Sequence, residues 1–174
     1  MIKNNTSVKR LVFTSLFSAL CTVATLIAFP AGFGYVNAGD MIVLLGAFCL
    51  SPIQAITAAA IGSAMADILC GYAIYAPATL IIKALMAAAA YYLMRTLKKT
   101  HLPTFLSAVI SAVAAELIMI VGYISYECFA LGYGSAALAS IPANLTQAIF
   151  GCVGGVGFYY VTKTTKLTNK LPAI

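Results

Sequence analysis

The sequence predicts an all-α integral membrane protein folded as a six-helix bundle, and three observations lead to this fold class. The 174-residue chain is 63% hydrophobic and only 8% charged, whereas a soluble domain carries about 25% charged residues. Its apolar stretches reach the length that an α-helix needs to cross about 30 Å of hydrocarbon. The alternating segments of about ten residues that a closed barrel requires are absent.

Polar clusters and prolines divide the chain into six spans of a single domain, residues 1–174. The spans are residues 9–29, 39–50, 53–71, 77–95, 104–127 and 141–162. A proline stands at every junction between spans, because proline cannot comfortably continue the preceding helix. The second span, about twelve residues long, is short for a full crossing of the bilayer.

The first span follows Lys9 and Arg10, so a cleaved signal peptide has to be considered. The span is longer than a typical signal core and no clear A-x-A site follows it, so we expect a retained helix. Within it, Ser15 and Ala19 are small residues four apart, and such a stripe lets another helix approach closely. Packing inside the bundle is the alternative explanation for the stripe.

The second span opens within "YVNAGDMIVLLGAF", residues 35–48. We predict that Asp40 caps this helix, since a carboxylate at a helix start accepts orphan amide hydrogens and suits the positive helix end. Gly39, directly before it, gives the backbone room to turn.

The fourth span contains a lysine, Lys83, in "PATLIIKALM". It lies about seven residues, hence roughly 10 Å, into the helix. A charge at such depth is costly and normally faces a partner or a watery cavity. We expect Lys83 to pair with Asp67, with Glu116 or with a substrate anion; snorkelling towards lipid headgroups is the alternative.

The fifth span carries Glu116 near the middle of the membrane. Tyr123 and Glu127 follow at i+7 and i+11, so the three side chains share one helix face. This polar stripe rises towards the outside and favours a cavity. The alternative is a structural acid that holds two helices together.

The sixth span opens with "IPANLTQAIFG", in which Asn144 and Gln147 share a face. Amides both donate and accept, which suits an uncharged heterocycle or a set of sugar-like hydroxyls; hydrogen bonding between helices is the alternative. "GCVGGVG", residues 151–157, indicates close helix packing, because no Lys–Ser/Thr pair follows as in a phosphate-binding loop. The chain has no such loop, so any ATP-driven action needs a partner.

The charges predict the topology. With the N-terminus in the cytoplasm, nine of the ten basic residues fall at the inner ends of the six spans, and the tenth is Lys83. This satisfies the positive-inside rule and places both termini in the cytoplasm. The four acids lie in the outer half or near the midplane. The net charge of +6 therefore reflects topology and not nucleic-acid binding, and the isolated cysteines and single histidine show no metal-ligand spacing.

These segments resemble the substrate-binding S components of bacterial energy-coupling factor (ECF) vitamin transporters. The resemblance covers nearly the whole chain and rests on "GYVNAGDMIVLLGAFCLSPIQAITAAAIGSAMADILCGYAIYAPATLIIKAL". This stretch is similar to the family's G-Y-x-N-x-G-D loop, its G-S-x-x-A-D and G-Y motifs and its P-A-T-x-x-x-K helix. "AAELIMIVGYISYE" and "IPANLTQAIFG" resemble the family's fifth and sixth helices.

The resemblance implies a multi-pass protein of the bacterial cytoplasmic membrane that captures a micronutrient on the outer side. It implies no enzyme activity and no cofactor. The implied partners are a transmembrane coupling subunit and two cytosolic ATPase subunits. In the family, helix one carries an A-x-x-x-A stripe that meets the coupling subunit, and Ser15 and Ala19 occupy the matching register, with Ser in place of the first Ala.

The implied substrate is a small aromatic heterocycle of the hydroxymethylpyrimidine, pyridoxine or riboflavin type. A large anionic vitamin such as folate fits poorly, because the chain has no Trp and few charged residues. We expect the ring to stack on Tyr72, Tyr75 or Tyr123. The expected polar contacts are Asn37, Asp67, Lys83, Glu116, Asn144 and Gln147.

Two other classes of protein are alternatives. A stand-alone secondary transporter or channel-like protein needs an inverted repeat or a water pathway through both halves. The sequence shows no convincing repeat, and the inner half has almost no intramembrane polar residues. A membrane enzyme, such as a lipid-head-group transferase, needs clustered acids or a His/Ser nucleophile system. The acids are spread over three helices, so this class is the least favoured.

Overall fold

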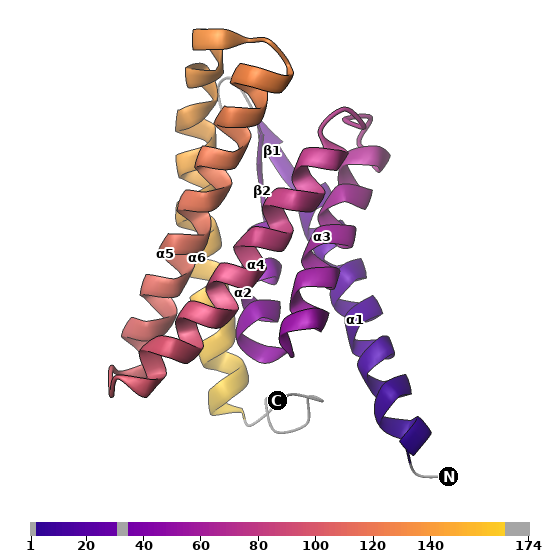
Figure 1. Ribbon diagram of the computed structural model, residues 1–174, viewed down its shortest axis with the longest axis vertical. Helices are drawn as coiled ribbons and strands as arrows, with labels where there is room; N and C mark the ends of the chain where they lie inside the picture. The colour runs from indigo at the N-terminus through magenta and orange to yellow at the C-terminus, as the bar shows by residue number, and fades with distance from the viewer. Residues whose placement is uncertain (1–2, 31–34, 166–174) are drawn as a thin grey trace.

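A computed structural model describes residues 3–30 and 35–165, which are almost entirely helical (Figure 1). The α-helices of this part are α1 (Lys3–Leu26), α2 (Gly39–Cys49), α3 (Pro52–Leu69), α4 (Ala76–Lys99), α5 (Thr104–Ser125) and α6 (Ile141–Thr164). Five helical segments are long and apolar enough to cross a membrane, and α2 is a shorter apolar helix. The predicted all-α, six-helix fold is confirmed.

The first helix ends earlier than predicted. α1 stops at Leu26, and Ala28–Pro30 (β1) pairs antiparallel with Tyr35–Asn37 (β2). The prediction of a helix as far as residue 29 is therefore wrong. The residue before a proline is driven to an extended conformation, and the hairpin supplies partners for the backbone groups beyond the helix end. Ala38 N also donates to Ala24 O (3.2 Å), so the hairpin lies against the end of α1.

Two helices extend further at their polar ends than their hydrophobicity predicts. α1 begins at Lys3 instead of residue 9, and α4 continues to Lys99 instead of residue 95. Leucine and lysine are good helix formers, and cations favour the negative C-terminal end of a helix, which accounts for the extension of α4 through Lys98 and Lys99. The connection from α5 to α6 is helical as well, through a π-helical turn, η1 (Tyr126–Ala130), and a 3₁₀ helix, η2 (Gly134–Ser140).

The helices form a closed ring in which α1, α3, α4, α5, α6 and α2 each pack on the next. The short helix α2 also packs against α3 and α4, so it occupies the middle of the bundle. Eight of its eleven residues are buried. This central place explains why a helix too short to cross the membrane is nevertheless apolar on nearly all sides.

Small residues allow the helices to pack closely. A Cβ atom on Gly155 of α6 would lie 2.7 Å from Leu44 Cβ of α2, and one on Gly62 of α3 would collide with the backbone of α1 at Ser18. The interpretation of "GCVGGVG" as a packing segment is thereby confirmed. The outward faces carry exposed large apolar side chains such as Leu117 and Val121, as expected for a protein surrounded by lipid.

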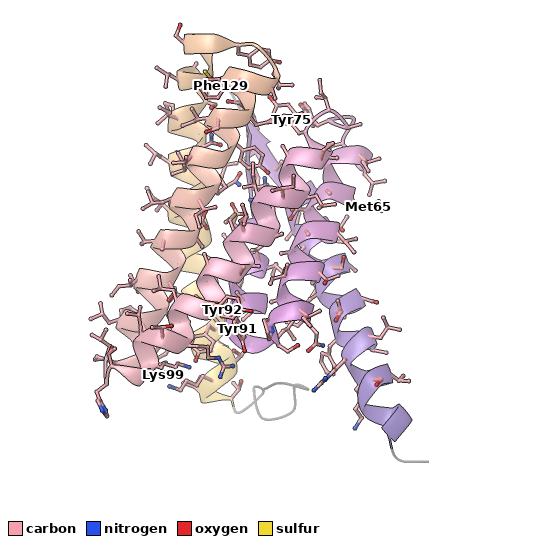
Figure 2. All side chains as sticks on the ribbon, viewed as in Figure 1. Met65, Tyr75, Tyr91, Tyr92, Lys99 and Phe129 are labelled. Atoms are coloured by element: carbon pink, nitrogen blue, oxygen red, sulfur yellow. The ribbon has the colours of Figure 1, made fainter. Side chains whose placement is uncertain are left out.

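The two ends of the bundle differ in charge. Lys98 and Lys99 end α4, and Lys163 lies in the last turn of α6; Figure 2 shows Lys99 at this basic end and Tyr75 and Phe129 at the other. We call the second end, which carries the α3–α4 and α5–α6 connections, the cavity end. Lys166 and Lys170, which the sequence analysis also assigned to the inner side, lie outside the described residues.

Candidate substrate-binding site

A cavity of about 500 Å³ opens at the cavity end and is lined by residues of α1, β2, α3, α4, α5 and α6. Pockets that hold small organic ligands have volumes of about 300–1,000 Å³. Most of the predicted ligand contacts line this cavity, namely Asn37, Asp67, Tyr72, Tyr75, Tyr123, Asn144 and Gln147. Lys83 and Glu116 do not line it.

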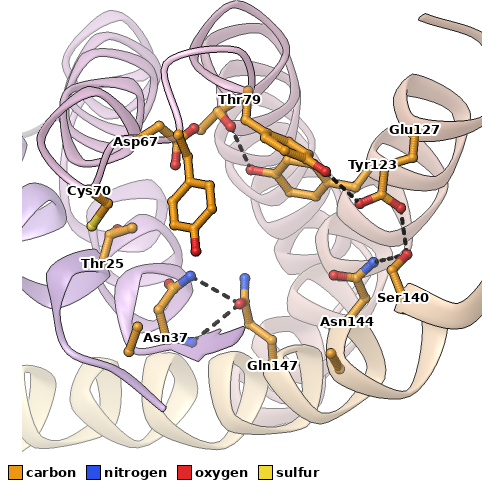
Figure 3. Close-up of a pocket in the computed structure, with 14 residues that line it drawn as sticks. Thr25, Asn37, Asp67, Cys70, Thr79, Tyr123, Glu127, Ser140, Asn144 and Gln147 are labelled. Carbon is orange, nitrogen blue, oxygen red and sulfur yellow. Dashed lines mark hydrogen bonds between the residues drawn. The ribbon is translucent and has the colours of Figure 1, made fainter. Parts of the chain in front are cut away.

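The floor of the cavity is formed by the side-chain amides of two residues, and a buried carboxylate beneath them is hydrogen-bonded to one of the two. Gln147 Oε1 accepts from the backbone N (3.3 Å) and Nδ2 (3.1 Å) of Asn37, and Gln147 Nε2 donates to Asp40 Oδ2 (2.6 Å). Asn37 Oδ1 accepts from Gly39 N (2.9 Å). Figure 3 shows the Asn37–Gln147 contacts facing the open space. These bonds fix which edge of each amide is presented to a ligand.

Lys83 forms a buried ion pair with Asp40, to which its Nζ donates a hydrogen bond. The predicted partners, Asp67 and Glu116, are wrong. Because α2 lies in the middle of the bundle, its first turn brings Asp40 against α4, and spacing along the chain does not reveal this contact. The lysine is only 4% exposed, and its Nζ also lies 5.6 Å from the Tyr123 ring centroid.

The predicted helix cap is also wrong. The N-cap residue of α2 is Ala38, which makes no side-chain capping bond, and Asp40 directs its carboxylate to Lys83 and Gln147 instead of to the helix start. Gly39 is predicted from the sequence to give the backbone room to turn. Its role in the structure is to let the side chains of Thr25 and Asn37 lie close to the backbone of α2, since a Cβ atom at this position would collide with Thr25 Oγ1 and Asn37 Oδ1.

Glu116 lies beneath the cavity and is 2% exposed. Its carboxylate faces Gly151 of α6, where a Cβ atom would collide with it. Neither of its oxygens has a hydrogen-bond partner within the described part of the chain. Only part of the predicted polar face of α5 therefore reaches the cavity. Tyr123 and Glu127 line the cavity, whereas Glu116 lies deeper in the bundle and does not.

A second polar network stands at the mouth of the cavity and centres on Glu127 of η1 (Figure 3). Its Oε1 accepts from Tyr75 OH (3.3 Å) and its Oε2 from Ser140 Oγ (2.7 Å), while Asn144 Nδ2 donates to Ser140 Oγ (3.3 Å). Burial, reinforced by the Glu127 carboxylate, raises the pKa of the Tyr75 hydroxyl. Tyr75 therefore stays protonated and acts as the donor.

Two buried oxygens on the cavity wall lack hydrogen-bond partners among the described residues: Thr25 Oγ1 and Asp67 Oδ2. Buried polar atoms in folded proteins are nearly always paired, and an unpaired one is costly. Because Thr25 and Asp67 both line the cavity, a bound ligand is one possible partner for these oxygens, and the Asp67 oxygen would act as an acceptor. The neighbouring wall is completed by Thr79 and Tyr123, whose hydroxyls are 2.9 Å apart.

The sequence profile of one known protein family matches residues 5–164, nearly the whole chain, and the family is described as "ECF-type riboflavin transporter, S component". The chain belongs to this family. The predicted ECF S component is thereby confirmed. The protein is the vitamin-binding subunit of a transporter and not an enzyme, and its apolar helices make it a multi-pass membrane protein. Membership of the family implies association with ECF transmembrane and ATPase subunits.

This S component is also similar to a protein of Pyrococcus woesei described as "Uncharacterized protein in gap 3'region". The two sequences are 29% identical over 142 residues, which is 82% of this chain and 91% of the relative. The similarity therefore extends over most of both proteins.

The S component has a second hollow, of about 390 Å³, on its flank between α1 and α3. Ser15 and Ala19 line this α1 groove, together with Ser18, Thr22 and Ile61. The groove shares no lining residue with the cavity. Part of the small-residue surface of α1 serves packing within the bundle, because Thr22 Oγ1 donates to Gly62 O of α3 (2.9 Å). Ser15 and Ala19 remain beside open space.

Several cavity residues of the S component were not predicted as ligand contacts: Thr25, Ala28, Cys70, Thr79, Glu127, Ser140 and Ala143. Thr79 could have been found, since it precedes Lys83 by four residues on the same helix face. Glu127 was placed on the polar face of α5 but was not assigned to the site. Thr25 and Ser140 carry no sequence signal, because only the fold brings them to the cavity.

Proposed function

We propose that this S component binds riboflavin in the cavity and delivers it to an ECF transmembrane coupling subunit driven by two cytosolic ATPase subunits. The name of the family supports the choice of riboflavin among the heterocyclic vitamins that the sequence suggested. The observation that carries the proposal is the cavity itself, about 500 Å³ in volume and lined by three tyrosines and three side-chain amides.

The lining suits the two chemically different parts of riboflavin. Its flat three-ring system is aromatic and can stack on a tyrosine, as offered by Tyr72, Tyr75 and Tyr123. Its ring edge and hydroxylated side chain both donate and accept hydrogen bonds. Asn37, Asn144 and Gln147 can match either polarity, because an amide has donors and acceptors.

We infer the orientation in the membrane from the charges. The basic end, with Lys98, Lys99 and Lys163, faces the cytoplasm according to the positive-inside rule. The cavity then opens outwards, where an importer has to capture its substrate. We place the protein accordingly in the bacterial cytoplasmic membrane.

The α1 groove is the proposed contact with the coupling subunit. Helix α1 is covered by the bundle on one side only, and its other side is largely exposed. The small side chains of Ser15 and Ala19 would let a helix of the partner approach closely.

The test is to purify the full chain in detergent, identify by mass spectrometry what co-purifies, and titrate riboflavin while following its fluorescence. We expect saturable binding of one riboflavin per chain, and competition by neither hydroxymethylpyrimidine nor pyridoxine. Tight binding of one of those smaller heterocycles instead of riboflavin would refute the substrate assignment. Uptake into vesicles by this chain alone, without ATP or a partner, would indicate a stand-alone secondary transporter.

A further inference from the structure

The charged residues that line the cavity are all of one sign. Asp67 and Glu127 are acidic, and no lysine, arginine or histidine of the described residues lines it. The remaining two acids of the chain, Asp40 and Glu116, are buried beneath it. An anionic group on a ligand would therefore meet carboxylates and no exposed cation.

Lys83, which is buried beneath the cavity, does not offset the negative charge of the cavity lining. Lys83 is 4% exposed and already donates to Asp40. Glu116 adds a further carboxyl group at the same depth and contributes to the electrostatic environment of Lys83. A buried cation that is matched by its own anion has little attraction left for a second one.

Two helix N-termini point at the cavity mouth and would by themselves attract an anion such as phosphate. The N-cap residues of α4 and α6 are Tyr75 and Ser140. Both donate their hydroxyl to the same carboxylate, that of Glu127, at 3.3 and 2.7 Å (Figure 3). Glu127 thus occupies the position between the two positive helix ends that a phosphate group would need.

We infer that the cavity selects the uncharged vitamin and rejects its phosphate ester, with Glu127 as the main specificity-determining residue and Asp67 as the second. This inference rests on the proposed function and narrows its substrate to flavins without a phosphate. The free acceptor Asp67 Oδ2 favours a ligand that brings N–H or O–H donors. A phosphate group beside the half-buried carboxylates of Glu127 and Asp67 meets like-charge repulsion, for which we expect a discrimination of about 100-fold.

The test measures the affinity of the purified full chain for riboflavin and for riboflavin 5′-phosphate. In the wild-type protein we expect the phosphate ester to bind about 100-fold more weakly. We call the ratio of the two dissociation constants, phosphate ester over riboflavin, the affinity gap. Glu127→Gln should reduce this gap at least about tenfold, mainly by strengthening binding of the phosphate ester. Thr165→Lys is the matched control: it makes the same +1 change of charge at the exposed basic end and should leave the gap unchanged.

Further measurements test whether the phosphate ester binds more weakly because of its charge or because of its size, and they provide a second variant in case the first does not fold. Riboflavin 5′-acetate, a neutral ester, should bind more like riboflavin than like the phosphate ester. Higher salt should narrow the gap, because it screens charges. If Glu127→Gln does not fold, Asp67→Asn should narrow the gap in the same direction by a smaller factor.

The possible outcomes are distinct. Equal affinity for riboflavin and its phosphate ester would overturn the inference and leave the proposed function standing. A gap that neither variant changes, or that the acetate ester shares, would also overturn it, since size would then be the cause. Failure of riboflavin itself to bind would refute the proposed function.

Discussion

Asp40 connects the interior of the bundle to the floor of the cavity. It is fully buried and accepts hydrogen bonds from Lys83 of α4 and Gln147 of α6. Because Gln147 Nε2 is held by Asp40, its Oε1 is left to accept from Asn37. One carboxylate thereby fixes the amide groups of two residues that line the cavity.

At this scale we predict the effect of breaking the ion pair. Lys83→Met should lower the free energy of unfolding by about 3–5 kcal/mol, since it leaves the Asp40 carboxylate buried without a counter-charge. Thermal unfolding of the detergent-purified protein measures the change. The double variant Lys83→Met/Asp40→Asn should recover much of the loss, because neighbouring substitutions are not additive.

The control for the ion pair is Lys99→Met, which removes an exposed lysine of the same helix and should leave the unfolding temperature nearly unchanged. If Lys83→Met were as stable as the wild-type protein, the buried pair would not contribute to stability as argued.

At the scale of elements, α1 and α2 have opposite roles. The short α2 is enclosed by its neighbours and supplies both the packing centre and Asp40. Helix α1 packs on α3 and α2 but leaves most of its surface exposed. Because so little of α1 is buried, one face of the helix is free to contact a partner, and the α1 groove is a concave site on that face.

We predict that Ser15→Leu or Ala19→Leu stops transport but spares ligand binding. The larger side chain would fill the α1 groove and prevent a partner helix from approaching, while the cavity shares no residue with the groove. Riboflavin titration and uptake in cells that carry the whole transporter measure the two effects.

The matched control for the groove is Val12→Leu, an enlargement of an exposed residue on the same helix, which should preserve uptake. Loss of riboflavin binding in Ser15→Leu would show that the stripe serves the packing of the bundle instead.

For the molecule as a whole, charge is separated along the axis of the bundle. The acids lie at or beneath the cavity, and the basic residues other than Lys83 gather at the opposite end among the described residues. This polarity fits a protein that binds on one side of the membrane.

The orientation can be tested with cysteine labelling. Cys70 lies at the cavity end and is exposed, so we expect a membrane-impermeant thiol reagent to label it in intact cells. Cys70→Ser should reduce this labelling. A cysteine introduced by Thr165→Cys at the basic end should react only after the membrane is permeabilised. The reverse pattern would contradict the proposed topology.

The sequence alone determined the fold class, the helix count and half of the residues that line the cavity. Hydropathy and prolines define helices one by one, and a polar residue in an apolar span must face a cavity or a partner. For that reason the sequence predicts Asn37, Asp67, Asn144, Gln147 and the three tyrosines as site residues, and all seven line the cavity.

Only the tertiary structure decided which polar groups meet. Asp40 carries the same local pattern whether it caps its own helix or pairs with a lysine of another. The choice depends on α2 lying between α4 and α6, and this arrangement follows from packing between distant segments. The same holds for Glu127, whose role depends on the N-termini of α4 and α6 meeting beside it. The local sequence shows which polar residues are present, whereas the three-dimensional packing of the helices determines which of them form hydrogen bonds or ion pairs with one another.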